Sequence, residues 1–100
     1  MAPMSTPLED VAILLRPEDD VAVATRDLDT GTRLVRAGEE LIVRRTVPRG
    51  HKLAVHALAV DAPVRKYGQV IGRATRAIRV GEHAHVHNVE SGRRTDLSGR

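Results

Sequence analysis

Three of the five histidines in this 100-residue chain stand at alternate positions in one short segment, as His83, His85 and His87. In an extended strand, residues i, i+2 and i+4 point to the same face, so the three imidazoles would lie side by side while Ala84 and Val86 point the other way. Neighbouring rings would start from Cα atoms about 7 Å apart, because a strand rises about 3.3 Å per residue. Such a face could gather around one metal ion or one bound molecule.

The histidine-rich segment is predicted to work together with a second group of polar side chains, His51-Lys52 and Lys66-Tyr67. The same residues also fit plainer roles. The three histidines could be the solvated face of an edge strand, and His51-Lys52 could be turn residues without a ligand. Tyr67, the single aromatic residue, fits the core as well as a ligand site. His56 is assigned a structural role.

The elements that would carry these side chains are short. Apolar runs, each separated from the next by polar turns in which Gly and Pro recur, lie at 11–15, 21–24, 41–43, 52–55 and 69–71. No stretch shows a long apolar stripe with the 3.6-residue period of a helix, and one helical turn is expected near 56–59. Many short strands between such turns are typical of an all-β sandwich, barrel or clip-like fold.

A pattern recurs along the chain: an apolar residue, a turn former three residues later, and another apolar residue after three more. Its copies begin at Leu28, Val47, Leu58 and Ile78. The turn former is Gly in three copies and Asp61 in the other, and Gly reaches positive φ without steric cost. Because the third copy follows the first by about 30 residues and the fourth follows the second by nearly the same interval, the pattern indicates two similar halves.

The composition restricts the function classes. With no Phe or Trp, the core must be built from Val, Leu, Ile and Ala, which favours β structure. The absence of Cys excludes disulfides and cysteine-based zinc or nucleophile sites. The net charge of +3 comes from 16 basic and 13 acidic residues, and one aromatic residue is a poor platform for stacking bases, so nucleic-acid binding is not favoured. The arginines suit small anionic ligands.

No segment reads as a signal peptide or a membrane span. The N-terminus lacks a basic start followed by an apolar run. No apolar stretch approaches the roughly 20 residues that cross a bilayer. We expect a cytoplasmic protein that binds neither membrane nor nucleic acid, with a flexible N-terminus over 1–9, one domain over 10–89 and a flexible polar tail over 90–100.

Three motifs resemble one known family. Segments 48–52 (PRGHK), 64–74 (VRKYGQVIGRA) and 81–88 (GEHAHVHN) resemble the SAF domain of the altronate/galactarate dehydratase family, and the likeness spans about residues 11–89. The ordered set of Gly-His-Lys, Lys-Tyr-Gly-x-x-Ile-Gly and His-x-His-Asn is more specific than any one of its parts. The resemblance implies a β-clip fold, all-β, with at most one or two short helical turns.

The resemblance also implies a function. The chain would be an accessory part of a metal-dependent hydro-lyase, or dehydratase, that acts on sugar acids such as altronate or galactarate. It would serve as a small N-terminal domain or a separate small subunit, inactive without a larger catalytic subunit. A divalent metal ion, Fe²⁺, Mn²⁺ or Mg²⁺, would be shared with or held by that subunit. The chain could also form a homo-oligomer.

Water elimination from a 2-hydroxy acid requires removal of a proton beside a carboxylate, with a base within reach and a cation to stabilise the charge. The predicted residues are, for catalysis, His51 and Tyr67; for substrate binding, Lys52, Lys66, Arg73 and Asn88; and for metal binding, His85 and His87. Because no cluster of Asp or Glu accompanies the histidines, the chain is expected to carry part of an active site. His83 stands where relatives commonly have an aromatic residue and is left outside the set.

Two other functions fit the same sequence. The chain could be the small subunit of a sulfolactate-type sulfo-lyase, which the same family includes. It could also be a non-catalytic SAF module for binding or assembly, because a fold does not fix a function.

Overall fold

The structure, a computed structural model, describes residues 5–91 and is nearly all-β. No helix in this part of the chain is long and apolar enough to cross a membrane. In chain order the elements are β1 (Thr6–Pro7), the 3-10 helix η1 (Leu8–Asp10), β2 (Ala12–Ile13), β3 (Val21–Ala24), β4 (Arg33–Arg36), β5 (Glu39–Ile42), β6 (Lys52–Ala54), β7 (Pro63–Lys66), β8 (Gln69–Ala74), β9 (His83–Ala84) and β10 (Val89–Ser91). The predicted all-β, clip-like class is confirmed.

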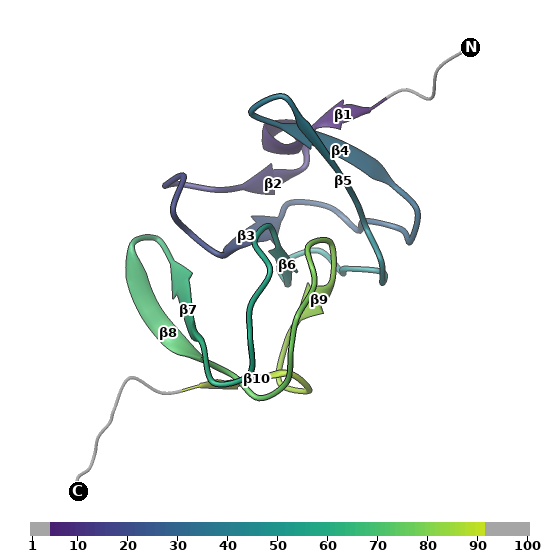
Figure 1. The fold of residues 1–100 in the computed structure, drawn as a ribbon. Coiled ribbons are helices and arrows are strands. Elements are labelled where there is room, and N and C mark those ends of the chain that lie inside the picture. Colours follow the sequence, from purple (N-terminus) through teal and green to yellow (C-terminus); the bar gives the residue numbers. More distant parts are fainter. Residues whose placement is uncertain (1–4, 92–100) are drawn as a thin grey trace, which may run out of the picture.

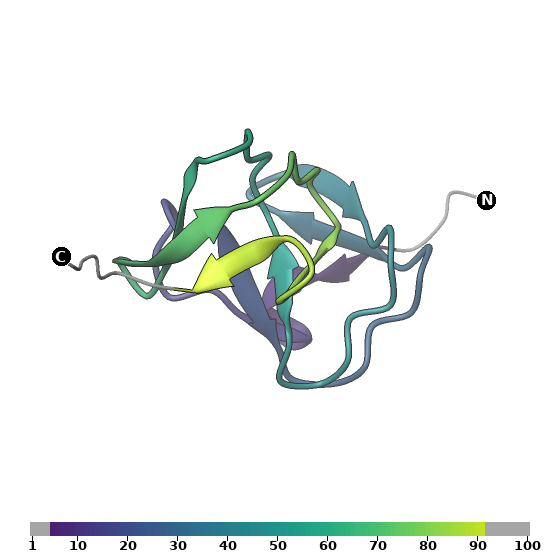
Figure 2. The same ribbon diagram turned by 90° about the horizontal axis from the view of Figure 1, so that it is seen from below.

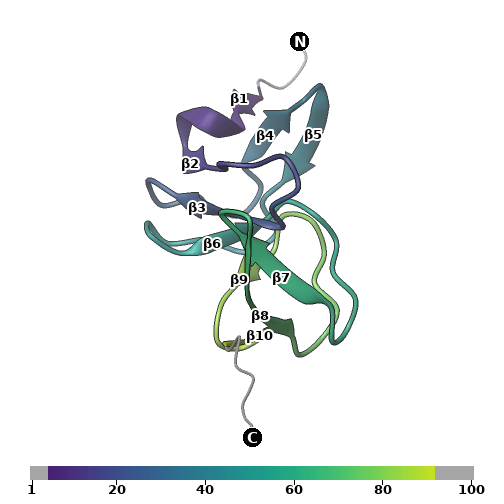
Figure 3. The ribbon, with the colours of Figure 1, turned by 90° about the vertical axis from the view of Figure 1, so that its left-hand side faces the viewer.

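The strands form three small sheets, with orders β1-β4-β5, β2-β3-β6-β9 and β10-β8-β7. The first and last lie at opposite ends of the molecule, and the four-stranded sheet lies between them (Figures 1 and 3). In Figure 2 the yellow β10 runs alongside the green β8, to which it pairs in antiparallel register. The only parallel pair among the described strands is β1 with β4. The middle sheet ends on β9, which carries the first residue of the histidine-rich segment.

The internal recurrence predicted from the sequence is present in the backbone. The four residues that begin its copies form two antiparallel bridges, Leu28 with Val47 and Leu58 with Ile78. The four turn formers all have positive φ, at 91° for Gly31, 84° for Gly50, 70° for Asp61 and 93° for Gly81. Asp61 therefore takes the same left-handed conformation as the three glycines. Each half uses one bridge and two such turns to lead the chain into and out of a hairpin.

The two hairpins, β4–β5 and β7–β8, are also equivalent. Ala37 and Gly38 turn the first with φ of 52° and 80°, and Tyr67 and Gly68 turn the second with φ of 56° and 78°. Two consecutive residues with positive φ are typical of the tight type I′ turn. The only tyrosine is thus held at a hairpin tip rather than in the core.

The interior is aliphatic, as the composition predicted, and it is divided into two clusters. One is built around Leu34, Val43 and Leu53, and the other around Val64 and Ile78. Each cluster lies between the middle sheet and one of the end sheets, since residues of β3 and β6 contribute to both. Burial of these side chains stabilises the fold by about 25 cal/mol per Å² of apolar surface.

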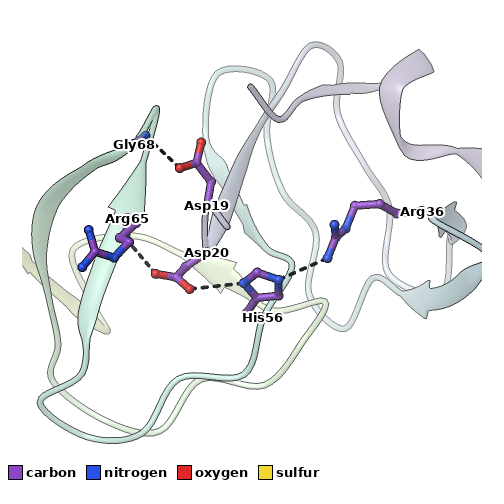
Figure 4. Close-up of polar contacts among 6 residues, drawn as sticks. All are labelled: Asp19, Asp20, Arg36, His56, Arg65 and Gly68. Carbon is purple, nitrogen blue, oxygen red and sulfur yellow. Dashed lines mark hydrogen bonds and ion pairs between the residues drawn. The ribbon is translucent and has the colours of Figure 1, made fainter. Parts of the chain in front are cut away.

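Two adjacent carboxylates tie the β7–β8 hairpin to the segment before β3 (Figure 4). Asp19 is fully buried, and its two oxygens accept the backbone N–H groups of Tyr67 at 2.7 Å and Gly68 at 2.8 Å. Asp20 accepts the N–H of Arg65 at 2.8 Å. The hairpin is therefore oriented by side chains that lie more than 40 residues earlier in the chain.

His56 continues this network toward the other end of the molecule (Figure 4). Its Nδ1 lies 3.3 Å from an oxygen of Asp20, and its Nε2 lies 3.2 Å from a guanidinium nitrogen of Arg36 on β4. A guanidinium only donates hydrogen bonds, so Nε2 accepts and Nδ1 carries the proton that is donated to Asp20. The structural role predicted for His56 is confirmed.

Some expected elements are corrected. The helical turn expected near 56–59 is absent, because Leu58 is held extended by its bridge to Ile78, and the only helix in the described residues is η1. The apolar run 11–15 is only partly a strand, and Leu15 is 64% exposed. Within this run, only Ala12 and Ile13, which form β2, are paired with a neighbouring strand.

The ordered structure also extends beyond the expected domain limits of 10 and 89. β1 pairs with β4, and Leu8 is buried in the core, so this part of the predicted flexible N-terminus is ordered. At the other end, β10 runs to Ser91. A short terminal segment becomes ordered when burial of an apolar side chain and backbone hydrogen bonds offset the conformational entropy that it loses. The rest of the predicted flexible ends, 1–4 and 92–100, lies outside the described residues.

Candidate functional site

The histidine-rich segment is not one continuous strand. β9 ends at Ala84, and residues 85–88 form a turn that we call the histidine turn. The buried side chain of Asn88 closes this turn: its Oδ1 accepts the N–H of His85 at 2.8 Å, and its Nδ2 donates to the carbonyl of His83 at 2.9 Å. Local side-chain hydrogen bonds of Asn compete with sheet pairing. The predicted single strand face is therefore wrong beyond Ala84: Ala84 is buried, whereas Val86, expected on the same face as Ala84, is 82% exposed.

The turn nevertheless brings imidazoles together with the ring of His51. Pairing of β6 with β9 places Lys52 opposite Ala84, and His51 comes directly before β6. His51 Nδ1 lies 2.9 Å from His83 Nε2, and the rings of His51 and His85 are stacked with centroids 4.3 Å apart. We call His51, His83 and His85 the histidine cluster.

The histidine cluster has the composition and spacing of a metal site. One ring nitrogen from each of its residues lies within 4.8 Å of the others. Nitrogens bound to one ion at about 2.0–2.1 Å are roughly 3–4 Å apart, which this spacing permits. His87 lies outside this group, with its ring 5.4 Å from that of His83. His83, which was not among the predicted metal ligands, thus lies with His85, which was. The other predicted ligand, His87, lies outside the histidine cluster.

The protonation states of His83 and His85 also suit metal ligands. Burial, and then the positive charge that His51, His85, His87 and Lys52 can carry, lowers the pKa of His83 from 6.5 to about 4. The pKa of His85 is lowered in the same way, by burial and then by the neighbouring His51, Lys52 and His87. Both rings are therefore neutral near pH 7, the form that binds metals or accepts a proton.

A cavity of about 260 Å³ opens beside the histidine cluster. Its walls are Lys52, Lys66, Ile71, Ala84, His85, Val86, Val89 and Ser91. We call it the lysine cavity. Burial, and then the charge of Lys66, lowers the pKa of Lys52. A negatively charged ligand between two ammonium groups would relieve their repulsion, so this cavity is suited to a carboxylate.

The remaining predicted site residues are not walls of the lysine cavity. Tyr67 stands at the hairpin tip, 37% exposed, with Nζ of Lys66 at 5.0 Å from its ring centre. Arg73 lies on β8 and forms ion pairs with Asp61 and Glu90. Asn88 uses its amide inside the histidine turn. The structure therefore brings together His51, Lys52, Lys66 and His85 and leaves Arg73 apart from them.

Sequence reasoning missed two features of this region. His83 carried a usable signal, since it shares the alternate spacing of His85 and His87, but that spacing alone does not select which ring faces His51. Asp19 and Asp20 lie in the polar turn between the apolar runs 11–15 and 21–24 and were not singled out, although they hold the hairpin that carries Lys66 and Tyr67. Their signal was two adjacent acids directly before an apolar strand.

Comparison with known proteins gives a family. The model of the altronate/galactarate dehydratase SAF domain matches residues 10–92. Altronate dehydratase of Bacillus subtilis is 38% identical over 79 residues, which are 79% of this chain and 16% of that protein. Altronate dehydratase of Escherichia coli is 44% identical over 80 residues, which are 80% of this chain and 15% of that protein.

A relative of different size is the (2R)-sulfolactate sulfo-lyase subunit alpha of Chromohalobacter salexigens. It is 53% identical over 51 residues, which are 51% of this chain and 54% of that subunit. The chain thus spans about one sixth of the length of the two altronate dehydratases and about half of the sulfo-lyase subunit. The match over 10–92, together with the clip-like fold, shows that this chain belongs to the altronate/galactarate dehydratase SAF domain family.

Proposed function

We propose that this SAF domain is an accessory part of a metal-dependent hydro-lyase for sugar acids such as altronate or galactarate, and that it contributes side chains to an active site that a larger catalytic chain completes. The observation that carries the proposal is the lysine cavity directly beside the histidine cluster. Relatives named altronate dehydratase and galactarate dehydratase support the reaction class.

The residues would divide the work by chemistry. Lys52 and Lys66 hold the substrate carboxylate, since ammonium groups at one cavity wall attract and orient an anion. Tyr67 donates a hydrogen bond or transfers a proton from the nearby hairpin tip, whereas His51, the other residue predicted for catalysis, acts as a ligand in the histidine cluster. Among the described residues no carboxylate lines the lysine cavity or belongs to the histidine cluster. A larger chain would have to supply the missing acidic groups.

The histidine cluster would hold the metal ion. Three imidazole nitrogens suit Fe²⁺ better than Mg²⁺, which prefers oxygen ligands. A bound divalent ion supplies Lewis-acid stabilisation of the negative charge that develops beside the substrate carboxylate. The chain's own contribution is to keep the rings of His51 and His85 stacked at a fixed spacing and to lower the pKa of His83 and His85, so that the ion competes with few protons at these two rings near pH 7.

Metal binding can be tested on the 100-residue chain alone. Titration with Zn²⁺ near neutral pH, followed by NMR of the imidazole protons, should shift the signals of His51, His83 and His85 and leave His56 unchanged. His83→Asn should weaken binding at least about tenfold, whereas His87→Asn should have a much smaller effect. Equal losses in the two variants would assign the ion to a different set of rings.

The reaction itself requires both chains. The large dehydratase-type subunit from the same organism is assayed alone, with this chain, and with this chain carrying Lys52→Gln. Elimination of water from altronate and galactarate should require both proteins and should fall in the variant. Full activity of this chain alone, or an unchanged rate of the large subunit without it, would contradict the proposal.

A second candidate is the small subunit of a sulfolactate-type sulfo-lyase. The 53% identity over 51 residues to a subunit alpha of such an enzyme favours it. The same assay with (2R)-sulfolactate distinguishes the two reactions by their products. Assembly with the large subunit but no role in any of these reactions would instead identify a non-catalytic module.

A further inference from the structure

A second cavity lies on the other side of the histidine turn. It has a volume of about 240 Å³, and four of its walls are Arg44, Arg45, Arg76 and Arg79. His83 and His87 also line it. We call it the arginine cavity. Neither the proposed reaction nor the predicted site residues use any of these arginines.

The four arginines come from two loops that the backbone holds together. The N–H of Arg44, just after β5, donates to the carbonyl of Gly81 at 2.8 Å, and Nε of Arg44 donates to the carbonyl of Val80 at 3.3 Å. A Cβ on Gly81 would lie 1.9 Å from the carbonyl oxygen of Ile42, so only glycine permits this approach. The close approach of these two loops therefore places the four arginines around one cavity.

The charges in the arginine cavity are poorly balanced. Glu82 is the only acidic residue of its wall, and it is paired with Arg79 at 3.0 Å. Arg45 and Arg76 make no hydrogen bond or ion pair with any residue in 5–91 that would neutralise them. Guanidinium groups gathered without counter-charges repel one another, and an oxyanion that accepts their fork-like N–H pairs reverses this cost.

We propose that the arginine cavity is a binding site for a compact oxyanion, a carboxylate, phosphate or sulfonate group, held chiefly by Arg45 and Arg76. The cavity volume is small, and its wall reaches His83, so a bound group would lie next to the histidine cluster. The oxyanion could be a free ion or one end of an acidic substrate whose other end lies in the lysine cavity. Binding of one end of a substrate rests on the proposed function, whereas binding of a free ion does not.

The chain itself provides a matched control. Arg45 and Arg76 each stand two residues before a bridge residue, Val47 and Ile78 respectively. Arg26 stands two residues before Leu28, in the same local position, but it does not line the arginine cavity. Arg26→Gln therefore removes the same charge from an equivalent backbone site.

The test is an NMR titration of the full chain with inorganic phosphate near neutral pH. Saturable shifts are expected at the backbone and guanidinium signals of Arg45 and Arg76. The double variant Arg45→Gln/Arg76→Gln should weaken phosphate binding at least about tenfold, while Arg26→Gln should change it less than about twofold. No saturable shift at these arginines, or an equal loss in Arg26→Gln, would overturn the proposal.

A second titration with galactarate separates the two sources. If one end of the substrate occupies the arginine cavity, both the double arginine variant and Lys52→Gln should weaken galactarate binding, whereas Lys52→Gln should leave the phosphate-induced shifts of Arg45 and Arg76 unchanged. If a free ion is the ligand, the double variant should affect phosphate alone. Absence of binding to either anion, with weaker association of the double variant with the large subunit, would show that the arginines contact a protein and would refute a small-ligand site.

Discussion

At the scale of single residues, two buried polar side chains do most to position the site. Asp19 holds the hairpin tip through two backbone N–H groups, and Asn88 closes the histidine turn through two backbone contacts. Both are almost completely buried. A buried polar group that loses its partner costs more than a hydrogen bond gains, so these contacts are expected to be sensitive to substitution.

Asp19→Ala should destabilise the protein by about 1–3 kcal/mol, because the N–H groups of Tyr67 and Gly68 lose their acceptor. The neighbouring Glu18 is exposed, so Glu18→Ala should change the stability by less than about 0.5 kcal/mol. Urea unfolding followed by circular dichroism measures both. Equal stabilities of the two variants would mean that water replaces the carboxylate at little cost.

The depressed pKa of His83 predicts a pH dependence of stability in the metal-free protein. The unfolded chain binds a proton at this ring near pH 6.5, whereas the folded chain does so only near pH 4. Stability from this ring is therefore complete above about 6.5 and is lost as the pH falls toward about 4. Unfolding free energies across this range should fall less steeply for His83→Gln than for the natural chain; parallel curves would contradict the assignment.

At the scale of elements, the fold depends on turns that place backbone segments in close contact. Gly50 and Gly81 occupy equivalent turns in the recurring pattern, with φ of 84° and 93°. A Cβ at Gly50 would meet nothing within 4 Å, whereas one at Gly81 would meet the backbone of Ile42. The same substitution therefore separates the cost of left-handed backbone from the cost of a steric clash.

Gly50→Ala should cost about 1–2 kcal/mol, the strain of a left-handed conformation. Gly81→Ala should cost clearly more, because the loop that carries Arg44 must also move away from the turn before β9. The comparison is made by urea unfolding of the two variants under the same conditions. A smaller loss for Gly81→Ala than for Gly50→Ala would show that the close approach of these loops does not stabilise the fold.

The elements that could be predicted from sequence are those set by local chemistry. The turns at Gly31, Gly50, Asp61 and Gly81 follow from the spacing along the chain, whereas the bridges between the residues that begin the copies were not predicted. The break in the histidine segment after Ala84 could not be predicted in this way. It depends on whether the Asn88 amide turns back on the main chain, a choice between local and sheet hydrogen bonds that strand periodicity does not contain.

At the scale of the whole molecule, the site lies at the edge of the middle sheet, and its parts come from distant segments. His51 and Lys52 come from β6 and the bend before it, Lys66 comes from the end of β7, and His85 follows β9. Sequence motifs identified most of these residues but not which side chains share a cavity. That grouping is set by the pairing of β6 with β9 and by the carboxylates that orient the hairpin, both of which join residues far apart in the chain.

The two arginine-bearing loops and the lysine cavity place positive charge on both sides of the histidine turn. Across the described residues, no acidic side chain joins the histidine cluster. An excess of basic over acidic side chains around the site is expected if the active site is divided between two chains, because the other chain would supply the acidic groups that oppose these charges. Under the proposed function, catalysis would therefore require the complex.

The most direct test of this account is the turnover number of the complex with the large subunit when the chain carries His51→Asn and His85→Asn. If the histidine cluster and its cavity belong to the active site, kcat should fall at least about 100-fold while the variant still binds the large subunit, since the Lewis-acid stabilisation lost with the two ligands is worth several kcal/mol of the barrier. Arg26→Gln should leave kcat unchanged. An unchanged kcat in the double histidine variant would contradict the account.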